Sequence, residues 1–537
     1  MYAIVIKNGE VIDGSGRISF HSDIAVWDGY IVKIGSAIEG SAREIIDASG
    51  CVVCPGFIDI NSHSDFSLYS NPKAESKVMQ GITTEIIGHG GHSLGPIHPS
   101  YLSELKEYTH SYLRNQNQPH FWKWKTQAEF IEVLHQRKTA VNIASLVGYG
   151  TIRVAVMGFQ KREPSAVEME AMKTLLEDEL IHGIHGLSFA LDVAPGSHAT
   201  MGELVEMAKI VKKYGGICTI HIREEGNFLF QSIKEAIEIS RKSGVKLLIS
   251  HLKAAHPQNW GKVKEAIGII NRARQSGLDV DYDIYPYTSY ESVLSDVLPP
   301  WLRDLSPYQI VESLKSEEVR RKVIEEMMDP MSTWGNPMMG SSWDRIRIVS
   351  MKRPENKRFE GRNIEQIAEC LNLKPQEVVL QLLIEEGVVK ILFSAMIETD
   401  LIEGMKQSMA IFGTDGLAVS PEGDYQGVNV HPRYYGSYPR ILGSYIREKN
   451  IMSLEDAIHK MTMLPAAKMN IGDRGLLAEG YKADITIFDK DQIIDKATFD
   501  DPHHYPEGIK AVIVNGVIVV KENEHTGELP GEVIKRT

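Results

Sequence analysis

The sequence is poor in cysteine and contains no long apolar run. Its 537 residues include four cysteines: Cys51, Cys54, Cys218 and Cys370. Cys51 and Cys54 form a lone C-x-x-C with no second Cys or His pair nearby, so we interpret them as small buried residues beside a strand. So few cysteines favour a reducing compartment. No apolar stretch approaches the roughly 20 residues that span a bilayer, and no signal peptide is evident. We therefore expect a cytoplasmic protein.

An excess of positive charge is also lacking. Lys and Arg total 58 against 71 Asp and Glu, a formal net charge of −13. That sign argues against nucleic acid or an anionic membrane as the main partner. Hydrophobic content of 43% and charged content of 24% are those of an ordinary globular protein. The chain exceeds the roughly 250–300 residues at which one core stops growing, so we expect a large domain and a smaller one.

Both ends of the chain are rich in short strands. Alternating apolar segments meet at Asn8-Gly9, Asp28-Gly29 and Asn515-Gly516, which are typical turns of two-residue β-hairpins. Two β-rich ends that bracket a long middle predict one small composite β-domain, a sandwich built from residues 1–55 and 472–537.

The middle of the chain, residues 56–471, alternates short apolar runs with helical patterns. Eight such βα-like units are expected for a (β/α)₈ TIM barrel, whose strands are buried on both faces and read as continuous apolar runs. The segment 299–358 breaks this rhythm because it is helical, charged and rich in methionine. We expect it to be an insertion after the seventh strand that could serve as a lid.

Polar residues collect where the expected barrel strands end. His63 follows the first strand, His89 and His92 the second, His221 the fifth, His251 the sixth and Asp415 the eighth. Barrel enzymes build their sites at the carboxyl ends of the strands. Neutral imidazoles together with a carboxylate suit Zn²⁺ that keeps an open coordination position. A single histidine in a strand is usually structural, but this many on separate strands predict a metal site.

Charged and phenolic groups lie near the same strand ends. Lys253 is two residues beyond His251, so the two-residue period of a strand directs both side chains inward. Arg433 follows the loop after Asp415, and Tyr285 ends the seventh strand. We expect Lys253 and Arg433 to hold a substrate carboxylate. For Arg223, which precedes two glutamates, an internal ion pair is as good an interpretation as a substrate contact.

These residues resemble those of the amidohydrolase superfamily, and within it the D-aminoacylase, or N-acyl-D-amino-acid deacylase, family. Similar stretches run through nearly the whole chain and include "PGFIDINSHSD", "GITTEIIGHGGHS", "HIREE", "ISHLK", "DYDIYPY", "GTDGLAVSPEG" and "HPRYYGSYPRILG". Together they are specific for the family but not for a substrate. The resemblance implies hydrolysis of the amide bond between an acyl group and a D-amino acid.

The resemblance also implies roles for individual residues. His63, His221, His251 and Asp415 would hold the metal, and Asp415 would be the general base and acid. Lys253, Tyr285 and Arg433 would recognise the substrate, and Tyr285 could donate a hydrogen bond to the developing oxyanion.

Two positions depart from the family pattern. The His-x-His of the first strand is Asn61-Ser62-His63 here, and Gly90 stands where the family turn carries a metal-binding cysteine. Glycine has no side chain to offer, and a neutral amide is a poor zinc ligand. His89, His92 or Asn61 could substitute for the lost ligands. We therefore expect about one divalent ion per chain.

The sequence thus predicts a metal-dependent hydrolase of a linear amide in a small carboxylate-bearing substrate. Two alternatives stay open: a cyclic-amide hydrolase, and a metal-poor family member that binds a ligand or performs non-hydrolytic chemistry. Retention of Asp415, Lys253 and Arg433 favours the hydrolase, since a pure scaffold needs neither a base nor two converging cations. A homo-oligomer is compatible with the sequence but not indicated by it.

Overall fold

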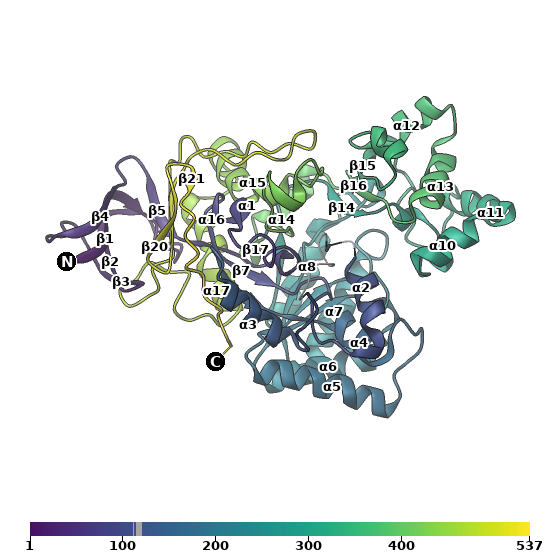
Figure 1. Ribbon diagram of the computed structural model, residues 1–537, viewed down its shortest axis with the longest axis horizontal. Coiled ribbons are helices and arrows are strands. Elements are labelled where there is room, and N and C mark those ends of the chain that lie inside the picture. Colours follow the sequence, from purple (N-terminus) through teal and green to yellow (C-terminus); the bar gives the residue numbers. More distant parts are fainter. Residues whose placement is uncertain (111, 114–120, 537) are drawn as a thin grey trace.

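Both ends of the chain contribute to one mixed sheet. The computed structural model describes residues 1–110, 112–113 and 121–536. Nine strands form this sheet, in the order β21-β20-β19-β18-β5-β1-β2-β3, with β4 paired to β1. They are β1 (Tyr2–Val11), β2 (Phe20–Trp27), β3 (Tyr30–Gly35), β4 (Ala42–Asp47), β5 (Val52–Pro55), β18 (Ile485–Phe488), β19 (Ile509–Val514), β20 (Val517–Lys521) and β21 (Glu524–His525). The antiparallel pair β5–β18 joins the two ends (Figure 1).

Two of the three predicted hairpin turns are present. Trp27 pairs with Tyr30 across Asp28-Gly29, and Val514 pairs with Val517 across Asn515-Gly516. The turn predicted at Asn8-Gly9 was wrong, because β1 continues through it and pairs with β2 on both sides of an irregularity between Ile6 and Gly9. Asn8 takes a φ of 62° there. A left-handed Asn before Gly serves a bulge as well as a hairpin, so the dipeptide alone does not distinguish them.

A parallel barrel occupies the middle of the chain. Its strands are β6 (Phe57–Asp59), β7 (Ile82–Ile87), β8 (Asn142–Ser145), β9 (Val147–Gly148), β10 (Gly186–Ala190), β11 (Ile217–His221), β12 (Lys246–Ile249), β13 (Val280–Ile284) and β17 (Ala410–Phe412). The short pieces β8 and β9 form one barrel strand interrupted at Leu146, which gives eight barrel positions. A parallel bridge between Ser62 and Gly416 closes the barrel between its first and last strands. The predicted (β/α)₈ fold is confirmed.

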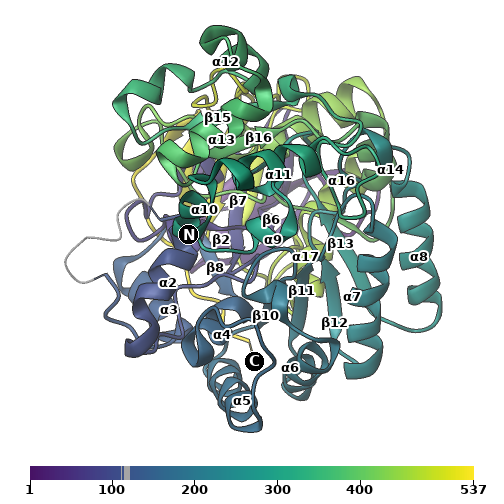
Figure 2. The same ribbon diagram turned by 90° about the vertical axis from the view of Figure 1, so that its right-hand side faces the viewer.

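Helices surround the barrel (Figures 1 and 2). They are α1 (Glu75–Val78), α2 (Leu102–Thr109), α3 (Gln127–Arg137), α4 (Tyr149–Met157), α5 (Ala166–Ile181), α6 (Met201–Lys213), α7 (Leu229–Ser243), α8 (Val263–Gln275), α14 (Glu398–Met405), α15 (Arg433–Arg440), α16 (Leu454–Met461) and α17 (Met463–Lys468). In α7 the buried Ile233, Ala236, Ile237 and Ser240 recur at helical spacing, so one face packs inward. The helix ends at Gly244, whose φ of 73° stops it.

The insertion after the seventh barrel strand is longer than the predicted 299–358 and is not only helical. It comprises β14 (Tyr290–Val293), α9 (Pro300–Arg303), α10 (Pro307–Leu314), α11 (Glu317–Met327), β15 (Ile346–Ser350), α12 (Ile364–Leu371), α13 (Pro375–Glu386) and β16 (Lys390–Phe393). The three strands pair as β14-β16-β15. Leu302, Leu314, Ile346 and Leu383 belong to a hydrophobic cluster that is largely the insertion's own. Figure 1 shows it at the end of the molecule opposite the mixed sheet.

The last residues of the chain leave the mixed sheet and lie along the barrel. The N–H of Ile143 in β8 donates to Glu532 at 2.9 Å, and the N–H of Ile534 donates back to Ile143 at 2.8 Å. The C-terminal part of the expected 472–537 segment therefore contacts β8 and not only the strands of the β-domain. Over the residues that the structure describes, no helix has the length and apolarity needed to cross a membrane.

Candidate active site

The predicted site residues lie at the carboxyl ends of the barrel strands. Asn61 and His63 follow β6, His89 and His92 follow β7, His221 ends β11, His251 and Lys253 follow β12, Tyr285 follows β13, Asp415 follows β17, and Arg433 begins α15. Most of these side chains are buried, and His221 is partly exposed. The carboxyl ends of parallel strands share one face of a barrel, so residues far apart in the sequence meet there.

Asp415 is held between an imidazole and a guanidinium. Its Oδ1 lies 3.1 Å from Nε2 of His63, and its Oδ2 lies 2.8 Å from Nη1 of Arg433. Burial by itself would raise the pKa of Asp415, but attraction to the Arg433 guanidinium outweighs it and lowers the pKa well below its usual range. The carboxylate is therefore ionised at neutral pH. Its backbone takes a φ of 49°, a left-handed conformation that is uncommon outside glycine and found at strained functional positions.

A second group gathers around the ends of β11 and β12. Ligand atoms of His221, Glu225 and His251 all lie within 4.8 Å of one another. Oε1 of Glu225 is 3.0 Å from Nδ1 of His251 and 3.9 Å from Nε2 of His221. On its other side, Nε2 of His221 lies 3.2 Å from Oδ2 of Asp192. Two imidazoles and a carboxylate converge here, which is a donor set that suits one divalent ion.

Lys253 lies inside this second group. Its Nζ donates to Oε1 of Glu225 at 2.7 Å and to Nδ1 of His251 at 2.7 Å. Burial lowers the pKa of His251, and the neighbouring ammonium lowers it further. The imidazole of His251 is therefore neutral, with a lone pair available to accept.

Comparison with known proteins agrees with this geometry. Residues 412–520 match the model of the amidohydrolase family. N-acyl-D-glutamate deacylase of Alcaligenes xylosoxydans xylosoxydans is 30% identical over 535 residues, which cover 99% of this chain and 96% of the relative. The chain belongs to the D-aminoacylase family of amidohydrolases. The predicted family is thereby confirmed, and its members are hydrolases of carbon–nitrogen bonds.

Solved D-aminoacylase-family structures share the whole fold. N-acyl-D-glutamate deacylase from Bordetella bronchiseptica, solved with zinc and a phosphonate mimic of the tetrahedral intermediate, superposes with a TM-score of 0.82 at 29% identity, covering 99% of both chains. A D-aminoacylase structure described in terms of a binuclear metal center, with one-metal activation and second-metal attenuation, gives a TM-score of 0.81 at 29% identity and covers both chains fully.

The two departures from the D-aminoacylase pattern both face the site. A Cβ built on Gly90 would lie 3.2 Å from Cε1 of His63, so the position that lacks a side chain points at a predicted ligand. Asn61 donates from Nδ2 to Asp283 at 3.2 Å, and its buried Oδ1 has no partner among the described residues. Both departures therefore change the donor atoms that these positions can offer.

The two histidines that flank Gly90 differ in their surroundings. His92 stacks on Tyr108 with ring centroids 4.0 Å apart, and its Nδ1 is within hydrogen-bond reach of the Gly90 carbonyl oxygen. His89 is 1% exposed, and within the described part of the chain neither of its ring nitrogens has a hydrogen-bond partner. Burial, and then the neighbouring His63, lowers the pKa of His89 to about 3. A neutral imidazole with two unpaired nitrogens fits a metal-facing position.

Asp283 in β13 belongs to the site although the sequence did not single it out. Its Oδ1 accepts from Nδ2 of Asn61 at 3.2 Å and from the N–H of His251 at 3.0 Å. Burial raises the pKa of Asp283 to about 8. The sequence signal for Asp283 was its spacing: it stands two residues before Tyr285 in "DYDIYPY", so the two-residue period of a strand puts both side chains on the same face. Asp283 therefore holds the backbone of His251 in place, and the side chain of His251 contacts Glu225.

Two cations approach the ring of Tyr285. Cζ of Arg433 lies 4.8 Å from the ring centroid, and Nζ of Lys253 lies 5.8 Å from it. The buried Tyr285 hydroxyl has no hydrogen-bond partner among residues 1–110, 112–113 and 121–536. A phenol donor and two positive charges on one wall suit an anionic group.

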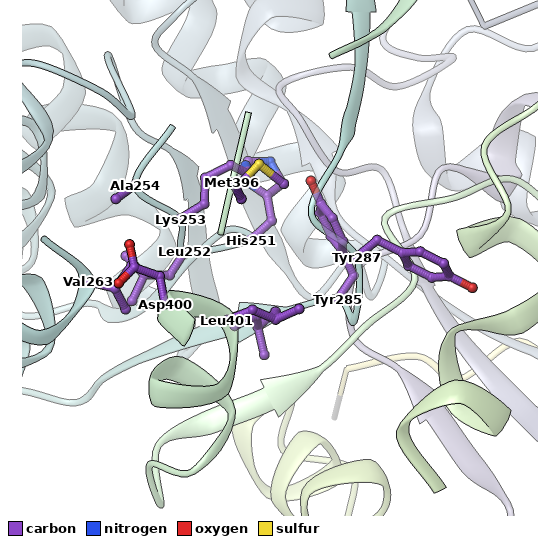
Figure 3. A pocket seen from close by; sticks show the side chains of 11 residues that line it. His251, Leu252, Lys253, Ala254, Val263, Tyr285, Tyr287, Met396, Asp400 and Leu401 are labelled. Atoms are coloured by element: carbon purple, nitrogen blue, oxygen red, sulfur yellow. The ribbon is translucent and has the colours of Figure 1, made fainter. Parts of the chain in front are cut away.

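A pocket opens beside these residues. It encloses about 310 Å³ of empty space, part of it open to solvent, and Figure 3 shows Met396 next to Lys253 and His251, with Tyr285 nearby. Apolar side chains, including Val263 of α8 and Leu401 of α14, form another part of its lining. The pocket therefore combines a charged end with an apolar wall.

Arg223 is the one predicted substrate-binding residue that the structure does not bring to this wall. Its guanidinium pairs with Glu235 of α7 at 3.0 Å and donates to the carbonyl oxygen of Ser197 at 2.8 Å. The alternative interpretation of Arg223 as an internal ion pair describes these contacts, although its partner is Glu235 and not the adjacent glutamates.

A buried ionic cluster supports the strands that carry Asn61, His63 and Asp415. Nζ of Lys77 lies 2.7 Å from Asp59 and 3.0 Å from Glu85, with all three side chains fully buried. Lys77 also donates to Thr414 Oγ1 at 2.7 Å, directly before Asp415. The cluster ties together β6, β7 and the end of β17.

Proposed function

We propose that this chain hydrolyses the amide bond of an N-acyl-D-amino acid and uses one zinc ion. The observation that carries the proposal is the ionised Asp415, held at 3.1 Å from His63 and 2.8 Å from Arg433 in a chain of the D-aminoacylase family. Zinc is supported by the related deacylase solved with that ion. The overall change adds water to the amide and releases a carboxylate and a free amino acid.

The metal would be held by His63, His221, His251 and Asp415, which follow or end four barrel strands. His89 is the favoured substitute ligand because its nitrogens are unpaired among the described residues, whereas His92 stacks on Tyr108. A bound zinc supplies Lewis acidity, which polarises the amide carbonyl and lowers the pKa of the attacking water.

Asp415 acts as the base in this proposal. Its carboxylate is ionised at neutral pH, so an oxygen lone pair is available for the proton of the attacking water. It then returns that proton to the leaving nitrogen, so the amine departs neutral. Arg433 orients the carboxylate through Oδ2 and leaves Oδ1 toward His63.

The carboxylate end of the substrate would lie against the positively charged wall formed by Lys253, Arg433 and Tyr285. Lys253 and Arg433 would bind its carboxylate, and the Tyr285 hydroxyl would donate to the oxyanion that develops as the carbonyl is attacked. The Tyr285 hydroxyl, which has no partner within the described segments, and the two cations near its ring support this arrangement.

The proposal is tested on zinc-loaded protein with N-acetyl-D-glutamate, N-acetyl-D-methionine, their L-enantiomers and a hydantoin. We expect release of acetate from at least one D-compound and slower or no release from its enantiomer. Ring opening of the hydantoin without cleavage of any linear amide would favour the cyclic-amide alternative. No turnover of any compound by zinc-loaded protein would favour the non-hydrolytic alternative.

We also propose a cytoplasmic enzyme with a small-molecule substrate. The cysteines support this location: all four lie in described segments and are free, and Cys51, Cys54 and Cys218 are buried. The assembly state stays a prediction to be measured by light scattering, which would distinguish a monomer from a homo-oligomer.

A further inference from the structure

Lys253 places a positive charge between two atoms that could bind a metal. Its Nζ is 2.7 Å from Oε1 of Glu225 and 2.7 Å from Nδ1 of His251, while those two acceptors are 3.0 Å apart. An ammonium has only donors, so it engages the same lone pairs that a divalent cation would take. The ligand atom of His221 completes a set that spans at most 4.8 Å. The position is thus built for a cation and is shared with the chain's own lysine.

Glu225 is directed at this position, whereas the adjacent glutamate is not. Glu224 accepts backbone N–H groups from Gly226 at 2.8 Å and Asn227 at 3.1 Å, so it stabilises the loop after β11. The Glu225 side chain is 14% exposed and lies against Lys253, His251 and His221. A buried carboxylate of this kind is costly unless it is paired with positive charge.

We propose that Glu225 is a metal ligand together with His221 and His251, and that Lys253 is the internal cation that occupies their shared position when no metal is bound. This inference rests on the proposed function, because it assumes a resident divalent ion. The ion replaces the ammonium at Glu225 and His251, and the freed lysine turns toward the pocket. Metal binding and the availability of Lys253 for an anionic substrate are therefore coupled.

The pocket lies directly beside that movement. It is lined by Lys253, His251 and Tyr285 and is partly open to solvent (Figure 3). Nζ of Lys253 is already 5.8 Å from the centroid of the Tyr285 ring. Cζ of Arg433 lies 4.8 Å from the same centroid. In this proposal, a lysine displaced from Glu225 rotates toward the Tyr285 ring, which Arg433 also contacts.

The simpler interpretation is that Glu225 only neutralises the charge of Lys253 and does not coordinate a metal. The two interpretations differ once the lysine is gone. If Glu225 is a ligand, its loss still weakens metal binding in a Lys253→Met background. If it is only a counter-ion, its loss has no effect there. The Lys253→Met/Glu225→Gln double variant also avoids leaving either buried charge unpaired, so its folding is protected.

The experiment measures the zinc dissociation constant of chelator-stripped full-length protein against a chromogenic zinc chelator, without substrate. We expect Lys253→Met to bind zinc at least about tenfold more tightly than the parent chain, and Glu225→Gln to weaken binding by a similar factor. The double variant should bind at least about tenfold more weakly than Lys253→Met alone. Circular dichroism and thermal melting check that each variant folds.

Matched controls remove the same charges nearby. Glu224→Gln alters the neighbouring glutamate, and Lys234→Met alters an exposed lysine on α7; both should bind zinc within about twofold of the parent chain, since neither charge faces the site. The inference is overturned if Lys253→Met fails to tighten zinc binding, or if Glu225→Gln changes nothing in the Lys253→Met background.

Failure of the proposed function gives a different result. If no amide is cleaved but the four zinc affinities follow the expected order, the enzyme assignment fails and the shared cation position stands. If an N-acyl-D-amino acid is hydrolysed but the variants bind zinc like the parent chain, the coupling of Lys253 to the metal is wrong.

Discussion

Nη1 of Arg433 lies 2.8 Å from Oδ2 of Asp415, and this ion pair is almost entirely buried, with side-chain exposures of 6% and 11%. The pair joins the first residue of α15 to the end of the eighth barrel strand. It keeps the carboxylate ionised and fixes which oxygen faces His63. The proposed base is therefore positioned before any substrate enters.

Asp415→Asn should reduce turnover of the preferred N-acyl-D-amino acid by at least about 10²-fold, because the amide cannot accept the proton of the attacking water. The measurement is the kcat of zinc-loaded protein, with thermal melting to show that the fold persists. Asp473→Asn, at an exposed position, is the matched control and should retain kcat. Unchanged activity of Asp415→Asn would remove Asp415 from the mechanism.

Purified protein should contain about one divalent ion or less per chain, because Asn61 and Gly90 supply no imidazole or thiolate. Gly90→Cys adds a thiol near His63, where a Cβ lies 3.2 Å from Cε1 of that ring, and should increase the metal bound. Elemental analysis and the thiolate absorption of cobalt-loaded protein measure this.

Gly90→Ala is the control for backbone strain in that experiment. It shares the left-handed φ of 63° but carries no thiol, so it should not gain metal or the cobalt–thiolate band. Two tightly bound ions in the unaltered protein would contradict the argument that the site has lost ligands.

Lys77→Met should destabilise the fold by about 3–5 kcal/mol, because it leaves two buried carboxylates, Asp59 and Glu85, without their cation. The change is measured by denaturant unfolding. Lys234→Met, which removes an exposed lysine, should change stability by no more than about 0.5 kcal/mol. Equal stabilities of the two variants would show that the Lys77 cluster does not hold the strands together.

Glu291 should make the stability of the protein depend on acid pH. It pairs with Lys390 at 3.0 Å and accepts from Tyr434 at 2.7 Å, and so links the insertion to α15. Burial opposes ionisation, but attraction to Lys390 and Arg433 outweighs it and lowers the pKa of Glu291 from 4.5 to about 2. A folded pKa below the unfolded value stabilises the fold above about pH 4.5, and this contribution is lost as the pH falls toward 2.

The test compares the unfolding free energy of the parent chain and Glu291→Gln at pH 7 and pH 3. The difference between them should shrink at the lower pH, because protonation removes the advantage of the carboxylate. For Glu369→Gln, on the exposed face of α12, the corresponding difference should be small at both pH values. If the difference in unfolding free energy between the parent chain and Glu291→Gln grows as the pH falls, the expected sign of the pH dependence is wrong.

Local sequence patterns were sufficient for the strand ends and for the residues that follow them. Continuous apolar runs predicted the barrel strands, and the polar residues after them predicted that His63, His221, His251 and Asp415 would lie at the same end of the barrel. This works because parallel strands bring their carboxyl ends together whatever the details of packing. The bounds of the insertion were not predictable in this way, since β14 pairs with β16 across about a hundred residues.

The sequence by itself indicated the family, the barrel and the two departures from the family pattern at Asn61 and Gly90. Only the tertiary structure decided which way the charged side chains after β11 (Ile217–His221) point. A two-residue period puts His221, Arg223 and Glu225 on one face, but the chain leaves the strand at His221, so Arg223 turns to Glu235 and Glu225 turns to His251. Side-chain direction after a strand depends on loop geometry, and loop geometry is set by packing against distant segments.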